Sequence, residues 1–275
     1  QEGMKLCFVF DGKAPDLKTQ TKDARAALKQ EASVLLKKAQ EAGDENAMRK
    51  YSARTVVLTK DMVREAKELI PLLGLPIIQA PSEGEAQTAY MSKKGDVYAS
   101  VSQDYDNLVF GCSRLIRNLS IAGRRKKTST LAYETIKPDM LSLEKNLQHM
   151  EIDLDQLIVI AILVGTDYNP KGVKGIGQKT ALKLVKEYNG KFDELFEKVE
   201  WDTQNDISWK EIFDVIKQIP VTDEYTLEWK PVQYEKLVEF LVEKHEFSED
   251  RVKTKLDKLV ANKEKLSQTG LGSFM

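Results

Sequence analysis

The sequence predicts an α/β fold built on a parallel sheet, and three observations support that expectation. Short apolar runs alternate along the chain with helix-forming segments, which is the pattern of a parallel sheet with crossover helices. The 275 residues are enough for one large domain or a domain with an appendage, and a hydrophobic fraction of 41% supports a sizeable core. Acidic residues follow the expected strands, at the sheet edge where α/β proteins bind ligands.

The expected elements follow from hydrophobic periodicity and from the residues that punctuate it. Strands are expected at residues 5–10, 75–78, 96–102 and 115–121. Helices are expected as a polar pair within 13–60, and then at 61–73, 82–93 and 154–164. A glycine-containing hairpin at 172–180 precedes a mostly helical remainder, whose last helix is expected at about 249–265.

Charge and composition exclude several classes of protein. The net charge of -1 combines 42 basic with 43 acidic residues, which indicates opposing patches. Residues 13–60 hold eleven Lys or Arg against six Asp or Glu, with a thin apolar stripe that predicts an exposed and mobile helix pair. No apolar run is long enough to span a membrane, and two cysteines with two histidines disfavour both a disulfide framework and a zinc site.

Six carboxylates stand where strands end or helices begin, and the parallel-sheet topology would bring them to one edge. Clustered carboxylates repel one another unless a cation compensates. Oxygen ligands without imidazole or thiolate favour Mg²⁺ or Mn²⁺, and two such ions can promote phosphoryl displacement. The candidate metal ligands are Asp11, Glu83, Glu85, Asp104, Asp106 and Asp167.

Each of these carboxylates also has an ordinary structural interpretation. Ser82 and Glu85 have the spacing of a helix capping box, in which Glu85 would only satisfy a backbone N–H. Asp11-Gly12 is a common turn pair, and Asp104 with Asp106 is compatible with a simple turn. The convergence of separate segments on one sheet edge favours a functional site over these alternatives.

The hairpin at 172–180 resembles a phosphate-binding loop but departs from the Walker pattern, because Gln178 displaces the lysine by one place. A helix–hairpin–helix is the better interpretation, in which Gly175 and Gly177 present backbone N–H groups to a phosphate. Lys179, Lys183 and Lys186 would share one helix face and track a duplex without reading its sequence, or form an ordinary solvated face. A second basic cluster, 124–127, is expected at a loop tip between strands.

Four sequence blocks together resemble the flap endonuclease family, particularly its archaeal members. They are ValPheAspGly at 9–12, AlaProSerGluGlyGluAla at 80–86, SerGlnAspTyrAsp at 102–106 and GlyThrAspTyrAsnProLysGlyValLysGlyIleGly at 165–177. The resemblance implies a 5′-nuclease (PIN-like) core with a helical arch at 13–60 and a helix–hairpin–helix DNA-binding region. It also implies a further segment before residue 9, with the first strand of the sheet and another metal-binding aspartate, which this sequence lacks.

The resemblance further implies a structure-specific 5′ flap endonuclease and 5′ exonuclease of replication and repair. Asp11, Glu83 and Glu85 would hold one Mg²⁺, and the other three carboxylates would hold a second, with Mn²⁺ able to substitute. Lys18 and Arg25 align with the basic pair that reaches the scissile phosphate. The DNA-binding set implied is Gly175, Gly177, Lys174, Lys179, Lys183 and Arg117, with a K⁺ ion at the hairpin.

The C-terminal residues match a sliding-clamp (PCNA-type) motif through Gln268, Leu271 and Phe274, although by composition they are a linker. We therefore expect a nuclease core at 1–165, a helical DNA-binding region at 166–265 and a clamp-binding tail at 266–275. An archaeal protein of this kind would be cytoplasmic and a eukaryotic one nuclear. One alternative is a non-catalytic fragment that binds DNA junctions and the clamp. A related repair nuclease or exonuclease is disfavoured by the short interval from Asp11 to Glu83 and by the tail.

Overall fold

The computed structural model describes residues 3–120, 123–126 and 133–269. The chain divides into two compact units, each assembled from separate stretches of sequence. The first unit contains residues 1–10, 56–79 and 223–275, and the second contains 11–55 and 80–222. The expected division into nuclease core, DNA-binding region and tail stays a prediction, because it concerns function rather than packing.

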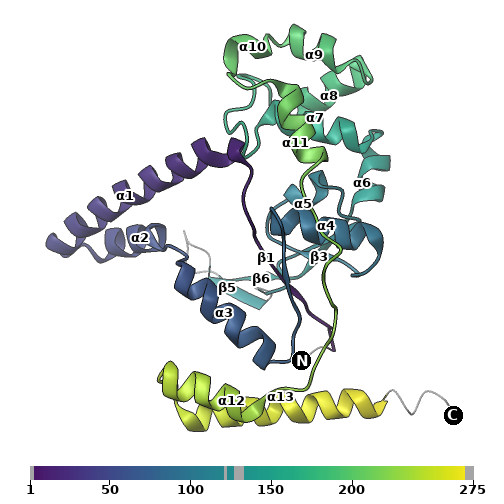
Figure 1. Cartoon of the computed structure of the whole chain (residues 1–275). Coiled ribbons are helices and arrows are strands. Elements are labelled where there is room, and N and C mark those ends of the chain that lie inside the picture. Colours follow the sequence, from purple (N-terminus) through teal and green to yellow (C-terminus); the bar gives the residue numbers. More distant parts are fainter. Residues whose placement is uncertain (1–2, 121–122, 127–132, 270–275) are drawn as a thin grey trace. The chain divides into compact units, whose positions relative to one another are not determined.

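The first unit combines a short parallel sheet with a helical cluster (Figure 1). Strands β1 (Phe8–Phe10) and β2 (Ile77–Gln79) pair in parallel, with Phe8 opposite Ile77. The helices are α3 (Lys60–Leu72), α12 (Tyr234–Val238), the π-helical η2 (Glu239–Lys244) and α13 (Glu249–Thr269). Leu237, Val252 and Leu256 form their buried core, against which the leucines of α3 pack.

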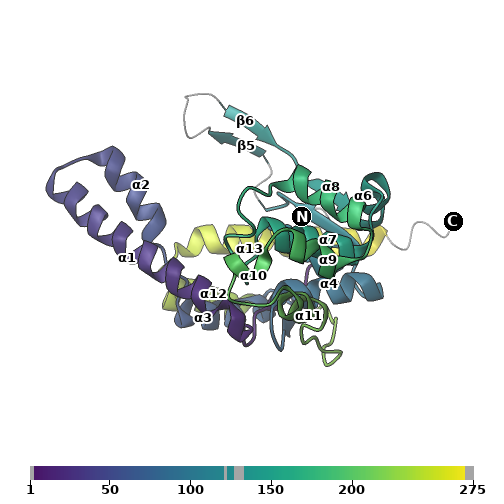
Figure 2. The same cartoon turned by 90° about the horizontal axis from the view of Figure 1, so that it is seen from above.

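The second unit contains a three-stranded mixed sheet and a separate β-hairpin. Strand β3 (Ser100–Val101) is parallel to β4 (Arg114–Arg117), which pairs antiparallel with β7 (Asp139–Ser142). Strands β5 (Gly123–Lys126) and β6 (Tyr133–Ile136) form the antiparallel hairpin that Figure 2 shows. Helices α4 (Gly84–Lys94), α5 (Asp106–Val109) and α6 (Leu143–Met150) accompany the sheet.

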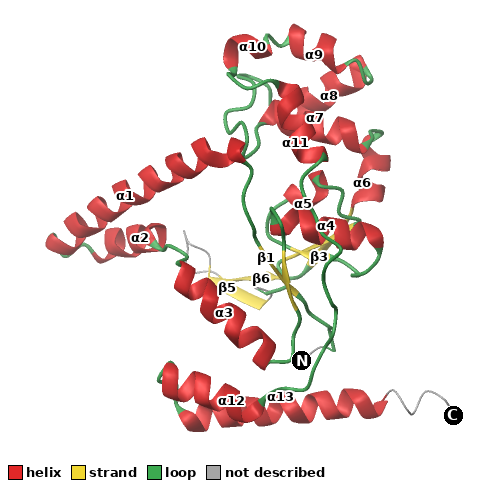
Figure 3. Cartoon of the chain, in the orientation of Figure 1, coloured by secondary structure: helices red, strands yellow, loops and turns green. Residues whose placement is uncertain are grey.

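The largest core of the second unit lies among its later helices, which are red in Figure 3. These are α7 (Leu154–Val164), α8 (Gln178–Tyr188), α9 (Phe192–Lys198), α10 (Trp201–Gln204) and α11 (Trp209–Lys217). Phe196 stacks on Trp209 with ring centroids 4.4 Å apart, and Trp201 is 1% exposed. This aromatic core gives the glycine hairpin between α7 and α8 a fixed base.

The polar segment after β1 forms the expected helix pair. A short 3₁₀ turn, η1 (Asp16–Lys18), leads into α1 (Thr19–Glu41), and α2 (Glu45–Thr55) runs back beside it (Figure 2). In the described residues of this pair, Leu28 and Val34 are exposed while Ala32 and Ala39 are buried. Small alanines at the contact allow close packing but bury little apolar area, which agrees with the thin stripe in the sequence.

The expected α/β class is confirmed, with differences in detail. The expected strand at 115–121 ends at Arg117, because Asn118 has a φ of 62°, which a strand residue does not adopt. Residues 124–126 lie in β5 and not at a loop tip, so that expectation was wrong, while Lys127 lies outside the described residues. The strand is defined by its pairing with β6, which a run of basic residues does not reveal in the sequence. None of the helices described is long and apolar enough to cross a membrane.

Candidate active site

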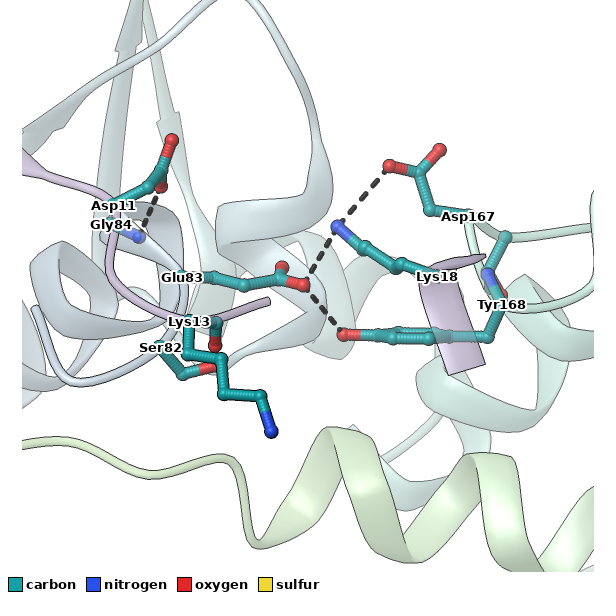
Figure 4. Close-up of polar contacts among 9 residues, drawn as sticks. Asp11, Lys13, Lys18, Ser82, Glu83, Gly84, Asp167 and Tyr168 are labelled. Atoms are coloured by element: carbon teal, nitrogen blue, oxygen red, sulfur yellow. Dashed lines mark hydrogen bonds and ion pairs between the residues drawn. The ribbon is translucent and has the colours of Figure 1, made fainter. Parts of the chain in front are cut away.

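The candidate site begins where the chain leaves β1, and it lies within the second unit. The backbone N–H of Gly12 donates to the Ser82 carbonyl at 2.6 Å, and Asp11 Oδ1 accepts from the Gly84 N–H at 2.7 Å (Figure 4). A Cβ on Gly12 would stand 2.2 Å from the Ala80 carbonyl oxygen. The Asp11-Gly12 pair is therefore required for a close backbone approach, which places the Asp11 carboxylate at the start of α4.

The centre of the site is a cluster of four side chains that we call the Lys18 cluster: Lys18, Glu83, Asp167 and Tyr168. The Lys18 ammonium lies 2.8 Å from Glu83 Oε1 and 3.2 Å from Asp167 Oδ2. The Tyr168 hydroxyl donates to the same Glu83 oxygen at 3.1 Å. Figure 4 shows Lys18 pointing between the two carboxylates. Segments 65 or more residues apart in sequence thus meet at one point.

Partial burial makes these contacts strong. The side chains of Lys18 and Glu83 are 15% and 9% exposed. Burial acts to lower the pKa of Lys18, but Glu83 and Asp167 outweigh it and raise that pKa above its usual value. Burial and the Glu83 carboxylate raise the pKa of the Tyr168 phenol. Lys18 is therefore a cation, and Tyr168 a proton donor, at neutral pH.

A second group of carboxylates is organised by Ser102, which follows β3. The Ser102 hydroxyl donates to Glu85 Oε1 at 2.7 Å and accepts from the Asp104 backbone N–H at 3.1 Å. Asp106 starts α5 and is held through its neighbour Asn107. The buried Asn107 amide contacts the Glu85 carbonyl at 3.2 Å, together with hydroxyls of α4 and β3.

The carboxylates are close enough to perturb one another. Burial, with the charges of Asp106 and Asp104, raises the pKa of Glu85 to about 7. Burial and the charge of Asp167 raise the pKa of Asp106 as well. Such crowding leaves negative charge that a further cation would stabilise. The site consists of hard oxygen donors, which suits Mg²⁺ or Mn²⁺.

The spacing of the donors is a separate matter. Among the residues described, no three His, Cys, Asp or Glu side chains are grouped closely enough to hold a metal ion. The Lys18 ammonium lies between Glu83 and Asp167, in the place that a metal ion shared by their carboxylates would occupy. The carboxylate oxygens are donors of the type that fits a divalent cation, and those of Glu83 and Asp167 form ion pairs with Lys18.

The structure assigns several predicted residues more definite surroundings. The capping-box interpretation of Glu85 is wrong, because Glu83 is the N-cap of α4, Ser82 donates to the Lys13 carbonyl and Glu85 binds Ser102. Glu85 is thus free of a capping role. Lys18 lies in the carboxylate site, whereas the side chain of Arg25 lies outside the described part of the chain.

The predicted DNA-contacting residues are spread over two places. Gly175 and Gly177 lie in the hairpin before α8, and Lys174, Lys179 and Lys183 are exposed beside it. Lys186 shares their helix but pairs with Glu151 at 2.8 Å. Arg117 lies on β4, where its guanidinium donates to the Gln103 carbonyl and stacks on Tyr105 at 4.1 Å.

Three residues of the site had no predicted role: Ser102, Asn107 and Tyr168. All are polar or amphipathic residues within two positions of a predicted ligand. That proximity in sequence was a signal, because a side chain near a ligand can orient a carboxylate from another segment. The predicted clamp-binding residues Leu271 and Phe274, and the side chain of Gln268, lie outside the described residues.

Comparison with known proteins identifies the class of this fold and site. A family model described as the XPG I-region matches residues 74–167. The DNA-bound catalytic core of Rad2 shares the fold, with a TM-score of 0.65 at 24% identity, over 94% of this chain and 79% of that one. The chain therefore has the fold of the Rad2 catalytic core, and its XPG I-region carries five of the six predicted carboxylate ligands.

More similar proteins narrow the class to one family. The chain is 46% identical over 259 residues to flap endonuclease 1 of Pyrococcus abyssi, covering 94% of this chain and 74% of that protein. The structure of flap endonuclease-1 from Methanococcus jannaschii matches with a TM-score of 0.67 and 41% identity, over 94% of this chain and 77% of that one. The chain belongs to the flap endonuclease 1 family. The predicted resemblance is confirmed, and the family's nucleases are generally metal-dependent hydrolases of DNA.

Proposed function

We propose that this chain hydrolyses a phosphodiester bond of DNA at a 5′ flap or junction, with divalent cations held by its carboxylates. The observation that carries the proposal is the pairing of Lys18 with Glu83 and Asp167, beside Glu85, Asp104 and Asp106, which are close enough to perturb one another's pKa, in a chain of this family. Two ions held there would activate a water and stabilise the oxygens of the displacement. The predicted ions are Mg²⁺, with Mn²⁺ as a substitute.

The residues of the chain divide this work. Asp11, Glu83 and Glu85 would hold one ion, and Asp104, Asp106 and Asp167 would hold the other and its surroundings. Ser102 and Tyr168 orient Glu85 and Glu83 through hydrogen bonds of 2.7 and 3.1 Å. Lys18 and Arg25 would place positive charge against the scissile phosphate as negative charge develops there.

The remaining proposed contacts hold and recruit the DNA. The hairpin and its exposed lysines would bind the duplex backbone without reading its sequence, with backbone carbonyls of the hairpin holding a K⁺ ion. The arch formed by α1 and α2 would pass the 5′ single strand. Gln268, Leu271 and Phe274 would bind a sliding clamp, which would place the nuclease at replicating DNA.

A labelled 5′-flap substrate tests the proposal directly. The chain should release the flap in Mg²⁺, should act poorly on a 3′ flap of the same sequence, and should stop when EDTA is added. The alternative is a protein that binds junctions without cutting them, and the engagement of two of its carboxylates by Lys18 is the observation in its favour. Flap binding without cleavage in Mg²⁺ and in Mn²⁺ would establish that alternative.

A further inference from the structure

We propose that the Lys18 ammonium is a built-in counter-ion of the carboxylate site, which a divalent cation must displace in order to bind there. The inference rests on one part of the proposed function, namely that these carboxylates take up a divalent cation. It assigns Lys18 a place in the protein without DNA, distinct from the contact with phosphate proposed for it during cleavage.

Three groups surround the Lys18 ammonium, and they come from two segments: one carries Glu83 and the other carries Asp167 and Tyr168. Glu83 Oε1 lies at 2.8 Å, Asp167 Oδ2 lies at 3.2 Å, and the Tyr168 ring centroid lies 5.3 Å from the ammonium nitrogen. Two carboxylates and the face of an aromatic ring form a binding site for a cation. The Lys18 side chain is only 15% exposed, so this contact is not a loose surface pair.

The same oxygen atoms would be needed by a metal ion. Glu83 Oε1 accepts from both Lys18 and Tyr168, which uses both lone pairs of that oxygen. A divalent ion bound to Glu83, or one bound to Asp167, would meet the Lys18 charge within the distance of an ion pair, where like charges repel strongly. Lys18 and the ion therefore exclude each other at Glu83 Oε1 and Asp167 Oδ2.

The Lys18 ammonium is able to move away from Glu83 and Asp167. It ends the three-residue turn η1, and its ammonium is carried on a flexible four-carbon stem. Tyr168 does not depend on Lys18 for its own hydrogen bond to Glu83, and it is 5% exposed. Departure of Lys18 would thus leave Glu83 oriented, with a mobile cation beside the site.

The binding of Mn²⁺ to the DNA-free protein, followed by electron paramagnetic resonance, tests the inference without reference to cleavage. We expect Lys18→Met to tighten Mn²⁺ binding by about tenfold or more. A cationic side chain within ion-pair distance of a carboxylate lowers the affinity of that carboxylate for a proton by about tenfold or more, and it should oppose the binding of Mn²⁺ at least as strongly. Lys18→Gln should tighten it in the same way. Lys13→Met is the matched control, because Lys13 is 85% exposed and pairs with Asp16 instead, and its affinity should equal that of the wild type.

The outcomes separate this inference from the proposed function. Equal or weaker Mn²⁺ binding in both Lys18 variants, with circular dichroism showing intact helices, would overturn it, as would a lack of binding in all proteins. Flap cleavage by the wild type in the same buffer reports on the proposed function alone. If the wild type cleaves the flap but the Lys18 variants bind Mn²⁺ no more tightly than the wild type, the proposed function is supported and the counter-ion role of Lys18 is contradicted.

Discussion

At the scale of single residues, the charge state of each carboxylate depends on its neighbours. Glu85 is half-buried and near Asp104 and Asp106, and its pKa of about 7 exceeds its ordinary value of 4.5. Between these two pH values an unfolded Glu85 is ionised while the folded one keeps its proton. The folded state then binds more protons, so stability from this group is full below pH 4.5 and is lost as pH rises through about 7.

The first prediction concerns Glu85→Gln in the absence of metal and DNA. The amide keeps an acceptor for the Ser102 hydroxyl but carries no charge, so the variant should be more stable than wild type at pH 8. We expect a gain of about 1 to 2 kcal/mol, allowing for solvent screening of a half-buried group. Urea unfolding at pH 5 and pH 8 measures it. An equal stability difference at both pH values would contradict the raised pKa of Glu85.

The residue scale also shows where sequence reasoning stops. The six carboxylates could be found because acidic residues after strands have a topological meaning. Ser102 and Tyr168 could be suspected from their nearness to predicted ligands, but their partners could not be predicted, because each acts on a carboxylate from another segment. The seat of Lys18 between Glu83 and Asp167 is likewise a tertiary fact.

At the scale of elements, the glycine hairpin offers a matched pair of substitutions. A Cβ would meet nothing within 4 Å at either Gly175 or Gly177, but φ is 82° at Gly175 and -94° at Gly177. Gly175→Ala should therefore cost about 1 kcal/mol of stability and weaken binding to duplex DNA, whereas Gly177→Ala should change little. Thermal unfolding and fluorescence anisotropy measure the two effects. Equal losses in both variants would show that φ is not what requires glycine here.

The lysines of α8 permit a prediction about salt. Lys179 and Lys183 are exposed, whereas Lys186 is engaged by Glu151. If the first two bind phosphates, each change to alanine should reduce the slope of log affinity against log salt by about one. Lys186→Ala is the control and should reduce it less. Titrations with a DNA duplex at several salt concentrations measure these slopes. Unchanged slopes for Lys179→Ala and Lys183→Ala would show that these lysines do not contact the duplex phosphates.

Elements with strong local signals were predicted well, and those set by tertiary pairing were not. Helix α7 spans 154–164 as expected, because a continuous apolar run follows the Asp153–Gln156 capping box. The strands proved shorter than their apolar runs, since pairing and not composition ends a strand. Ser82 has the sequence pattern of a helix cap, yet its hydroxyl donates to the Lys13 carbonyl.

At the scale of the whole molecule, family and fold class could be predicted because four blocks with chemical roles appear in order along the chain. The division into two discontinuous units could not, because residues 56–79 pack with 223–275 across a long stretch of intervening sequence. Local patterns say which segments are apolar but not which distant segments cover them.

A prediction for the intact chain concerns its C-terminus. Phe274→Ala should leave flap cleavage by the isolated protein unchanged, because the residue belongs to the proposed clamp motif and not to the carboxylate site. The same variant should lose any acceleration produced by an added sliding clamp. Cleavage rates with and without clamp measure this, and Ser273→Ala serves as the neighbouring control. Full stimulation of Phe274→Ala would remove the clamp-binding proposal.

The most direct test of the carboxylate site as the reaction centre is single-turnover cleavage of a labelled 5′ flap in Mg²⁺ by wild type and Asp104→Ala. Asp104 is exposed and gives only its backbone N–H to Ser102, so the substitution should spare the fold. We predict that the cleavage rate falls by at least about a hundredfold, while flap affinity measured in Ca²⁺ stays close to that of wild type. Cleavage by Asp104→Ala at the wild-type rate would contradict the assignment.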